Sequence, residues 1–238
     1  MDRPRYVAFG HSHVIGDLIE VIDATGGVLA KIVQNVPEVS VPHRPSLADR
    51  LARLQDPAFN PHRVNDAYPI AIEPLSAFEP QAGDRYLIGF TGFKMANLVE
   101  SLQERFGIRC ATLVHPTASI APRAQLAPGT IIQAGAIVAA RARLAPHVFV
   151  NKGVRIGSSS AIGRYSSLAP GVAIGRDVTL GTGVTLGIGS HVLDGMTVQD
   201  YATVAAGACV ITTAERNTLV AGVPAILKRT QFHSSLTP

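Results

Sequence analysis

The sequence predicts a small α/β domain followed by a parallel β-helix built from six-residue repeats. An aliphatic residue stands at every sixth position from Ile120 to Val210 without an interruption. Strand-like and helix-like patterns alternate before these repeats begin. The chain contains no Trp and only 16% charged residues, as expected of stacked coils with small aliphatic cores. We therefore place the α/β domain at residues 1–110 and the β-helix, with a short tail, at residues 111–238.

The period of six is neither the 3.6 of an α-helix nor the 2 of an isolated strand, and it is typical of a hexapeptide β-helix. Each aliphatic residue points inward and stacks on its counterpart one coil of eighteen residues away, which is worth about 1.5–3 kcal/mol per buried side chain. A small or branched residue two places earlier also turns inward. The glycines that follow some aliphatic positions are explained by a strained turn or by a close backbone approach. These are Gly157, Gly163, Gly175, Gly181 and Gly187.

The region before the repeats reads as a sequence of strands and helices. Tyr6–Gly10 is a short apolar run, and Val14, Leu18, Ile19 and Ile22 follow it at helical spacing. The further expected elements are a strand at 28–33, a loop at 36–67 with a short helix at 46–54, a strand at 86–90, a helix at 94–106 and a strand at 111–114. The turn after the first strand offers backbone N–H groups to a phosphate. The sequence of this turn, GHSH, lacks the full glycine fingerprint of dinucleotide-binding proteins. The turn could therefore equally be purely structural.

Composition and charge narrow the class of protein. The net charge is +4 and the sequence pI is about 9.3, which suits anionic small molecules such as nucleotides. Lys and Arg are scattered, so we expect no nucleic-acid partner. The sequence contains no apolar run of the ~20 residues that span a bilayer and starts without a signal-peptide pattern, which predicts a cytoplasmic protein without a membrane partner. Cys110 and Cys209 lack metal-ligand spacing and are expected to be free thiols, and no metal site is predicted.

Several motifs together resemble one family over almost the whole chain. The family is that of the sialic acid O-acetyltransferase type, which includes nucleotide-sugar N-acetyltransferases. The motifs are Gly10-His11 with Asp17, His115-Pro116-Thr117-Ala118, Ala169-Pro170-Gly171, Gly187-Ile188-Gly189-Ser190, Ala205-Ala206-Gly207-Ala208 and Ala221-Gly222-Val223-Pro224-Ala225. The resemblance implies a left-handed β-helix and a homotrimer with active sites between subunits. It also implies acetyl-CoA, or another acyl-CoA, in a groove between two β-helices, and a Rossmann-like domain that binds the nucleotide sugar.

The resemblance assigns binding residues by position. The turn that meets the nucleotide sugar falls on Phe9, Gly10 and His11. The acidic pair that follows the second strand in the family falls near Gln34 and Asn35, which are amides here. The positions implied for the acyl-CoA are Ser167, Gly187, Ile188, Ala206 and Gly207.

The chain departs from the family at the catalytic base. The family's His falls on Ser158 and its acidic partner on Ser159, and Ser is a poor general base near pH 7. One interpretation is acetyl transfer to the amine of a nucleotide-linked amino sugar, in surface polysaccharide synthesis, because an amine attacks a thioester without a strong base. A second is a relocated base, with Asp177 or His147 as candidates. A third is a catalytically inactive protein that binds acetyl-CoA or a nucleotide sugar.

Each candidate also has a structural interpretation. His147 occupies a turn, where a solvated His is the default, and Asp177 is placed to pair with Arg176 or Arg164 on the surface. His115 opens the repeats and reads as a structural residue. Ser160 occupies one of the small inward positions and is also expected to be structural.

Overall fold

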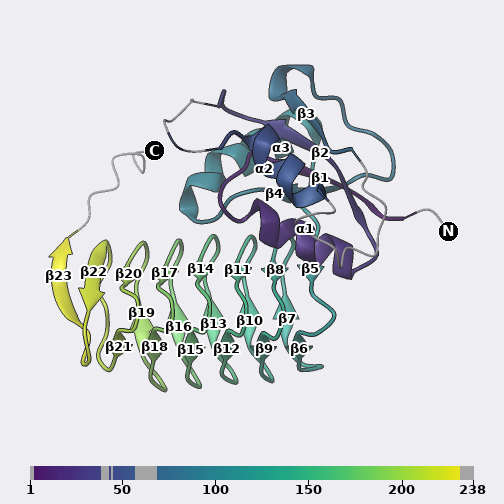
Figure 1. Ribbon diagram of the computed structural model, residues 1–238. Helices are drawn as coiled ribbons and strands as arrows, with labels where there is room; N and C mark the ends of the chain where they lie inside the picture. Colours follow the sequence, from purple (N-terminus) through teal and green to yellow (C-terminus); the bar gives the residue numbers. More distant parts are fainter. Residues whose placement is uncertain (1–2, 39–42, 44, 57–68, 231–238) are drawn as a thin grey trace. The chain divides into compact units, whose positions relative to one another are not determined.

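The computed structural model describes residues 3–38, 43, 45–56 and 69–230 (Figure 1). The chain forms two compact units. Unit 1 comprises the chain up to residue 90 together with residues 98–111, and unit 2 comprises residues 91–97 and the chain from residue 112 onward. Of the predicted loop at 36–67, residues 39–42, 44 and 57–67 lie outside the described part.

Unit 1 is built on a parallel four-stranded sheet in the order β3-β2-β1-β4. Its strands are β1 (Arg5–Phe9), β2 (Val28–Gln34), β3 (Ala71–Pro74) and β4 (Arg85–Ile88), and the helices are α1 (Ile15–Ala24), α2 (Leu47–Gln55) and α3 (Ala96–Phe106). The connections include the short 3₁₀ turns η1 (Leu75–Ala77) and η2 (Phe93–Met95). Strand β1 is central and all its residues except Arg5 are buried, as is usual for an inner strand of a parallel sheet.

Most elements expected before the repeats are present. The helix expected at 46–54 is confirmed as α2, and a capping box stabilises its first turn. In this box the backbone N–H of Asp49 donates to Ser46 Oγ at 3.1 Å, and the backbone N–H of Ser46 donates to Asp49 Oδ2 at 3.2 Å.

The strands of this region differ from the prediction in two places. Strand β3 was not foreseen, because it is a short, largely exposed edge strand that ends in Pro and therefore lacks an apolar pattern. The strand expected at 111–114 is reduced to β5 (Leu113–Val114), which pairs with a strand of the β-helix and not with the sheet of unit 1. Only a single bridge between Tyr86 and Cys110 extends the sheet of unit 1 at this point.

Unit 2 is a left-handed β-helix whose wall consists of three sheets, parallel except for the last strand of the first sheet (Figure 1). Strands one coil apart pair in register, as Arg155 does with Ile137 and with Ala173. The first sheet contains β5, β8 (Ile131–Ile132), β11 (Phe149–Val150), β14 (Ser167–Leu168), β17 (Thr185–Leu186), β20 (Thr203–Val204), β22 (Thr218–Ala221) and β23 (Ile226–Thr230). The second contains β6 (Ser119–Ile120), β9 (Ile137–Val138), β12 (Arg155–Ile156), β15 (Ala173–Ile174), β18 (His191–Val192) and β21 (Cys209–Val210). The third contains β7 (Gln125–Leu126), β10 (Arg143–Leu144), β13 (Ala161–Ile162), β16 (Thr179–Leu180) and β19 (Thr197–Val198).

The predicted aliphatic column forms the core of the β-helix. Every sixth residue from Ile132 to Val210 is buried, whereas Ile120 and Leu126 are only partly buried because they belong to the first coil. The small inward positions are buried as well. Ser160 Oγ donates to the Gly175 carbonyl at 2.9 Å and accepts from the Val178 N–H at 3.1 Å, which confirms that this hydroxyl is structural.

Close approach of the backbone, and not a strained turn, explains the glycines after the aliphatic positions. A Cβ on Gly157 would collide with the carbonyl of Gly175, one coil away, and a Cβ on Gly163 would collide with that of Gly181. The left-handed conformation occurs two residues later, with φ of 61° at both Ser159 and Tyr165. It recurs at every sixth residue from 129 to 207.

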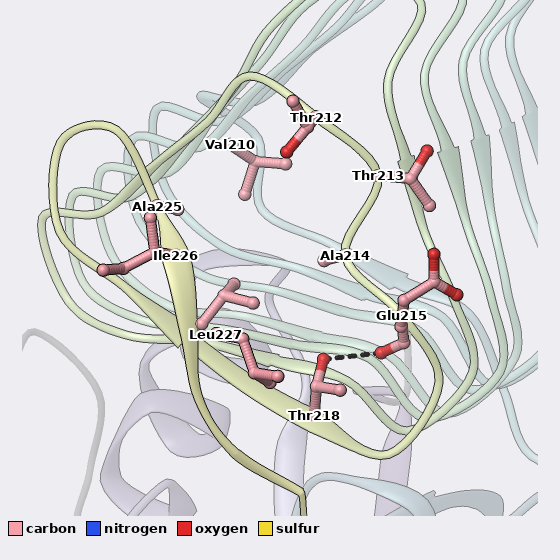
Figure 2. Close-up of a pocket in the computed structure, with 10 residues that line it drawn as sticks. Val210, Thr212, Thr213, Ala214, Glu215, Thr218, Ala225, Ile226 and Leu227 are labelled. Atoms are coloured by element: carbon pink, nitrogen blue, oxygen red, sulfur yellow. Dashed lines mark hydrogen bonds between the residues drawn. The ribbon is translucent and has the colours of Figure 1, made fainter.

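The β-helix is closed at its C-terminal end by an antiparallel hairpin of β22 and β23. A cavity of about 320 Å³ lies beneath it, and Figure 2 shows Val210, Ala225, Ile226 and Leu227 around this space. Thr218 Oγ1 donates to the Glu215 carbonyl at 2.6 Å at the rim. The lining is mainly apolar and continues the core column, so we interpret this cavity as the cap of the β-helix.

The segment 91–97 packs on the β-helix through Phe93. The Phe93 ring meets the Tyr201 ring edge-on, with the two centroids 5.6 Å apart. Gly183 makes room for both, because a Cβ on Gly183 would lie 2.8 Å from the Tyr201 ring and 3.0 Å from Phe93 Cβ. This packing explains why the segment belongs to unit 2.

Candidate functional site

The candidate residues of the β-helix lie on its three edges, where the chain turns from one sheet to the next. At each edge the left-handed position repeats once per coil of eighteen residues. The serine edge, between β12 and β13, carries Arg141, Ser159, Asp177 and Gly195 at this position. The histidine edge, between β13 and β14, carries Gly129, His147, Tyr165, Gly183 and Tyr201. The glycine edge, between β14 and β15, carries Gly135, Gly153, Gly171, Gly189 and Gly207.

The serine edge brings together three of the four residues considered for catalysis. The backbone N–H of Asp177 donates to the Ser158 carbonyl at 3.0 Å, so Ser158, Ser159 and Asp177 lie in adjoining coils. Arg141 Nε donates to Ser159 Oγ at 3.1 Å. A hydroxyl that accepts a hydrogen bond from a cation is poorly suited to take up a proton.

The arginine and aspartate next to this cluster form an ion pair with each other. Arg176 Nη2 lies 2.9 Å from Asp194 Oδ2, so Arg176 pairs with Asp194 and not with Asp177. Asp177 attracts Arg176 as well, as expected, but only as a weaker contribution. The backbone N–H of Arg176 also donates to Asp194, and these hydrogen bonds lower the pKa of the Asp194 carboxyl. Asp177 is exposed on the surface beside this pair. The serine edge thus presents charged and hydroxyl groups but no imidazole.

His147 lies on the histidine edge, whereas Ser158 and Ser159 lie on the serine edge. The expectation of a solvated side chain is wrong, because His147 is only 9% exposed. Its ring stacks on Tyr165 with centroids 5.6 Å apart, and Gly129 lies on the other side, where a Cβ would collide with the imidazole. Burial, with a smaller effect from Arg164, lowers the pKa of His147 and keeps its imidazole neutral near neutral pH.

The glycine edge is a bare strip of backbone. A Cβ on any of its five left-handed glycines would meet no atom within 4 Å. The other two edges accept Arg, His, Ser, Tyr and Asp at nearly the same φ, so backbone conformation alone does not require Gly here. The edge therefore has room for a ligand to approach the backbone closely.

Four of the five residues expected to contact an acyl-CoA lie together on the glycine edge. Ile188 is 63% exposed, an unusual environment for a large aliphatic side chain. Gly207 donates its N–H to the Ile188 carbonyl at 2.8 Å, which places Ala206 and Gly207 directly beside Ile188 in the next coil. Gly187 must be small, because a Cβ there would lie 2.5 Å from the Ala206 nitrogen.

The fifth residue, Ser167, lies on the sheet beside this edge. It faces outward on β14, and Thr185 and Thr203 occupy the same position on the next two strands. The row of three hydroxyls, the exposed Ile188 and the bare backbone together suit an elongated ligand with apolar and amide groups. The pantetheine arm of acetyl-CoA has this chemistry, so these residues fit it.

In unit 1 the expected substrate turn is tightly packed. The Phe9 side chain is fully buried, with its ring 4.9 Å from that of Phe78, so only its backbone is available to a ligand. Gly10 has φ of 69°, and a Cβ there would lie 2.7 Å from the Phe90 ring. His11 is partly buried, and its Nε2 lies 3.9 Å from Glu38 Oε1. Burial and then Arg50 lower the pKa of His11, against the opposing effect of Glu38.

Other kinds of chemistry find little support in the described residues. Both cysteines are free, and burial raises the pKa of the Cys110 thiol to about 12, which makes it unreactive. Over the described ranges, no three or more His, Cys, Asp and Glu side chains gather as a metal site would require. None of the helices in these ranges has the length and apolar character needed to cross a bilayer.

Solved acetyltransferase structures share this two-part fold. A mutant of the perosamine N-acetyltransferase from Caulobacter crescentus, solved with CoA and GDP-perosamine, is similar with a TM-score of 0.73 and 23% identity over 94% of this chain and 96% of that chain. The acetyltransferase domain of PglB from Neisseria gonorrhoeae, solved with acetyl coenzyme A, gives a TM-score of 0.74 and 19% identity over 95% and 100% of the two chains. WeeI from Acinetobacter baumannii gives 0.71 and 14% over 95% and 100%. No protein-family model and no curated protein matches the sequence.

Two features of these sites were missed from the sequence. The recurrence of Gly at 135, 153, 171, 189 and 207 is visible as a spacing of eighteen, but only the structure shows that no atom lies within 4 Å of a Cβ at these positions. The burial of His147 was also missed. Its signal is the pair of residues at the same position in the neighbouring coils, Gly129 and Tyr165, which supply space on one side and a stacking partner on the other.

Proposed function

We propose that the protein transfers the acetyl group of acetyl-CoA to the amine of a nucleotide-linked amino sugar. The observation that carries this proposal is the glycine edge with the exposed Ile188, which offers an open strip for acetyl-CoA on a β-helix of the transferase fold. Structures of the same two-part fold come from an N-acetyltransferase bound to CoA and GDP-perosamine and from an acetyltransferase domain bound to acetyl coenzyme A. The likeness extends over at least 94% of this chain.

The chemistry of the serine edge favours an amine over a hydroxyl as the acceptor of the acetyl group. An unprotonated amine attacks the thioester carbon, and the new C–N bond replaces the C–S bond. The proton that the amine loses passes to the leaving thiolate or to solvent. Such an attack needs positioning and stabilisation of the oxyanion more than a strong protein base. A hydroxyl acceptor requires proton removal as it attacks, and Ser159, which accepts a hydrogen bond from Arg141, is a poor base for that purpose.

The proposal extends to assembly and location. We place the acetyl-CoA along the glycine edge of one subunit and complete the site with a second subunit in a homotrimer located in the cytoplasm. Within one chain, His147 lies on a different edge from Ser158 and Asp177, so residues of a neighbouring copy would complete the surroundings of the thioester. Analytical ultracentrifugation of the purified protein tests the trimer directly.

A turnover assay tests the activity. The purified protein is incubated with acetyl-CoA and amino sugars linked to UDP, GDP or dTDP, with product mass and released thiol as readouts. We expect one of these amines to be acetylated. Intact sugars throughout, with acetyl-CoA or a nucleotide sugar still bound in calorimetry, would replace the proposal by a binding role without catalysis.

Ser158→His tests the base-free attack. A positioned general base is worth about 10²–10⁴-fold where proton transfer limits the rate. At pH 8 we expect kcat to change by less than about tenfold, because attack by the free amine does not depend on such a base. A gain of about 100-fold or more would show that the native site is limited by proton removal.

A further inference from the structure

The first coils of the β-helix carry positive charges only. Residues 112–176 contain seven Arg and Lys side chains and no Asp or Glu. The four acidic residues of the β-helix all come later, from Asp177 onward. A surface with charges of one sign attracts ligands of the opposite sign, and the proposed function has so far made no use of this imbalance.

Three of these arginines surround the serine edge, and we call Arg141, Arg143 and Arg155 the arginine cluster. Arg141 occupies the edge one coil before Ser159. Arg143 lies on β10, just after Arg141, and Arg155 lies on β12, just before Ser158. Strand β10 pairs with β13 and β12 pairs with β9, so the three arginines come from two adjacent coils (Figure 1). All three side chains are exposed.

The arginine cluster has no acidic partner in the part of the chain that the structure describes. The hydrogen bond that Arg141 Nε donates goes to Ser159 Oγ, an uncharged acceptor. The family's acidic residue falls on this same position, where an Asp or Glu would neutralise Arg141. The serine therefore holds Arg141 in place and leaves its charge available to a ligand.

The other charged groups of the serine edge do not cancel this positive charge. Arg123 precedes Ser159 by two coils and adds a further cation. Asp177 follows Ser159 by one coil, and its charge also attracts Arg176. Arg176 itself is paired mainly with Asp194. The described groups of this edge thus leave an excess of positive charge.

Small residues flank the arginine cluster on the outer surface of the β-helix. Arg143 pairs in register with Ala161 on β13, and Arg155 pairs with Ala173 on β15. Both alanines are partly exposed, and their short side chains leave room for a ligand group beside each guanidinium. A guanidinium binds a carboxylate through two parallel hydrogen bonds, so such groups beside serine hydroxyls suit a small planar anion.

We propose that the arginine cluster binds a carboxylate on the sugar ring of the acceptor, so that the substrate is a nucleotide-linked amino sugar acid. The inference rests on the proposed function, since it names the class of acceptor. In that function the amine reacts at the serine edge, and the atoms next to the arginines therefore belong to the ring that carries the amine. A phosphate of the nucleotide has related chemistry, and sugars that differ only in the carboxylate distinguish the two sources.

Acetylation rates of matched amino sugars test the carboxylate. Each pair is linked to UDP, GDP or dTDP, and its members differ only at C6, which is a carboxylate in one and a hydroxymethyl group in the other. We expect kcat/KM for the acid to exceed that for the neutral sugar by about tenfold or more, the value of one charge-assisted hydrogen bond. Equal values for the two members would overturn the proposal.

Arg155→Gln tests the arginine cluster itself. It should lower kcat/KM for the acid by about tenfold and leave the value for the neutral sugar unchanged, a difference that a purely structural role would not produce. Arg109→Gln removes an exposed arginine of unit 1 and is the matched control, with both values expected to equal those of the wild type. Arg141 is kept, because it also contacts Ser159. An unchanged preference for the acid in Arg155→Gln would overturn the site.

Calorimetry with the same sugars, without acetyl-CoA, separates this inference from the proposed function. Tighter binding of the acid, lost in Arg155→Gln, would keep the site even if no sugar were acetylated, and the proposed function would then fail. Acetylation of both members at equal rates would keep the proposed function and overturn the site. Weaker binding of both members in Arg155→Gln would assign the cluster to the nucleotide phosphates and overturn the carboxylate, as would the absence of binding by every acid.

Discussion

The glycine edge and the other two edges of the β-helix have the same backbone but different surfaces. At all three edges one residue per coil adopts a φ between 55° and 76°. The serine edge places Arg141, Ser159 and Asp177 at this position before a single glycine, and the histidine edge alternates glycines with rings such as His147 and Tyr165. The glycine edge leaves it empty in five successive coils.

This difference shows that the fold does not dictate the residue at the turn. A left-handed conformation costs an L-residue about 1–2 kcal/mol, and the other edges accept that cost at several positions. The run of five glycines on one edge is therefore not required by the turn itself, and the acetyl-CoA proposed for this edge would account for it. The same comparison separates these glycines from Gly157 and Gly163, which are required by the next coil of the chain itself.

The largest expected effect concerns the glycines packed between coils. Gly163→Ala should lower the free energy of unfolding by about 3 kcal/mol or more, because its Cβ would collide with the backbone carbonyl of Gly181. Gly195→Ala is the matched control, since Gly195 has φ of 70° and open space around its Cβ position, and should cost only about 1 kcal/mol. Urea denaturation measures both. Equal losses in the two variants would contradict the distinction between packed and bare glycines.

The next effect concerns ligand binding at the glycine edge. Asn tolerates the left-handed conformation, so Gly189→Asn should fold normally while its side chain obstructs the bare strip. We expect the Kd for acetyl-CoA in calorimetry to rise about tenfold, which corresponds to a loss of about 1.4 kcal/mol.

Gly195→Asn introduces the same side chain at the left-handed position of the serine edge and is the matched control. It should leave the Kd for acetyl-CoA unchanged. If both variants bind acetyl-CoA as the wild type does, the glycine edge is not the binding strip.

A smaller effect is expected from pH at the histidine edge. The folded protein lowers the pKa of His147 below its ordinary value of 6.5, so the unfolded chain takes up a proton first as the pH falls. The contribution of His147 to the free energy of unfolding is therefore largest above pH 6.5. It should decline as the pH falls from 6.5 toward the pKa of His147 in the folded protein.

His147→Asn keeps a residue that tolerates φ of 60° and removes the titrating group. Its unfolding free energy should fall less steeply than that of the wild type between pH 7 and pH 5, the range in which His titrates. His11, whose pKa is also lowered, is present in both proteins and cancels in the difference. Parallel pH profiles would show that His147 is accessible to protons in the folded state.

The smallest effect is expected at Arg141. Arg141→Gly removes an exposed hydrogen bond to Ser159 and relieves a left-handed conformation, while Gly adds entropy to the unfolded chain. These contributions nearly cancel, so the unfolding free energy should stay within about 0.5 kcal/mol of the wild type. A loss several times larger would mean that the serine edge is held by its side chains and is not equivalent to the glycine edge.

Much of the fold could be predicted because its repeat is local. An inward residue at every sixth position specifies a column, and each coil repeats the same solution, so the core from Ile132 to Val210 followed from spacing alone. Strand β3 could not be predicted in this way. Ala71 to Pro74 is exposed and short, and only its pairing with β2 makes it a strand.

The candidate site also has parts that could be predicted from the sequence and parts that could not. The stacking of Ser159 between Arg141 and Asp177 follows from counting eighteen residues, and the structure confirms the contacts. The contact that buries Phe9 could not be inferred, because it depends on the ring of Phe78 from another segment, whereas the burial of His147 has a signal in Tyr165, one coil away, that was missed.

The sequence by itself determined the β-helix, its coil length and the absence of an imidazole at Ser158, because these depend only on residue type and spacing. The tertiary structure decided which glycines are packed and which are bare, since that depends on what the neighbouring coil places within reach of each Cα. It also decided that α1 and α2 border one cavity, because only the packing of unit 1 brings these two helices together.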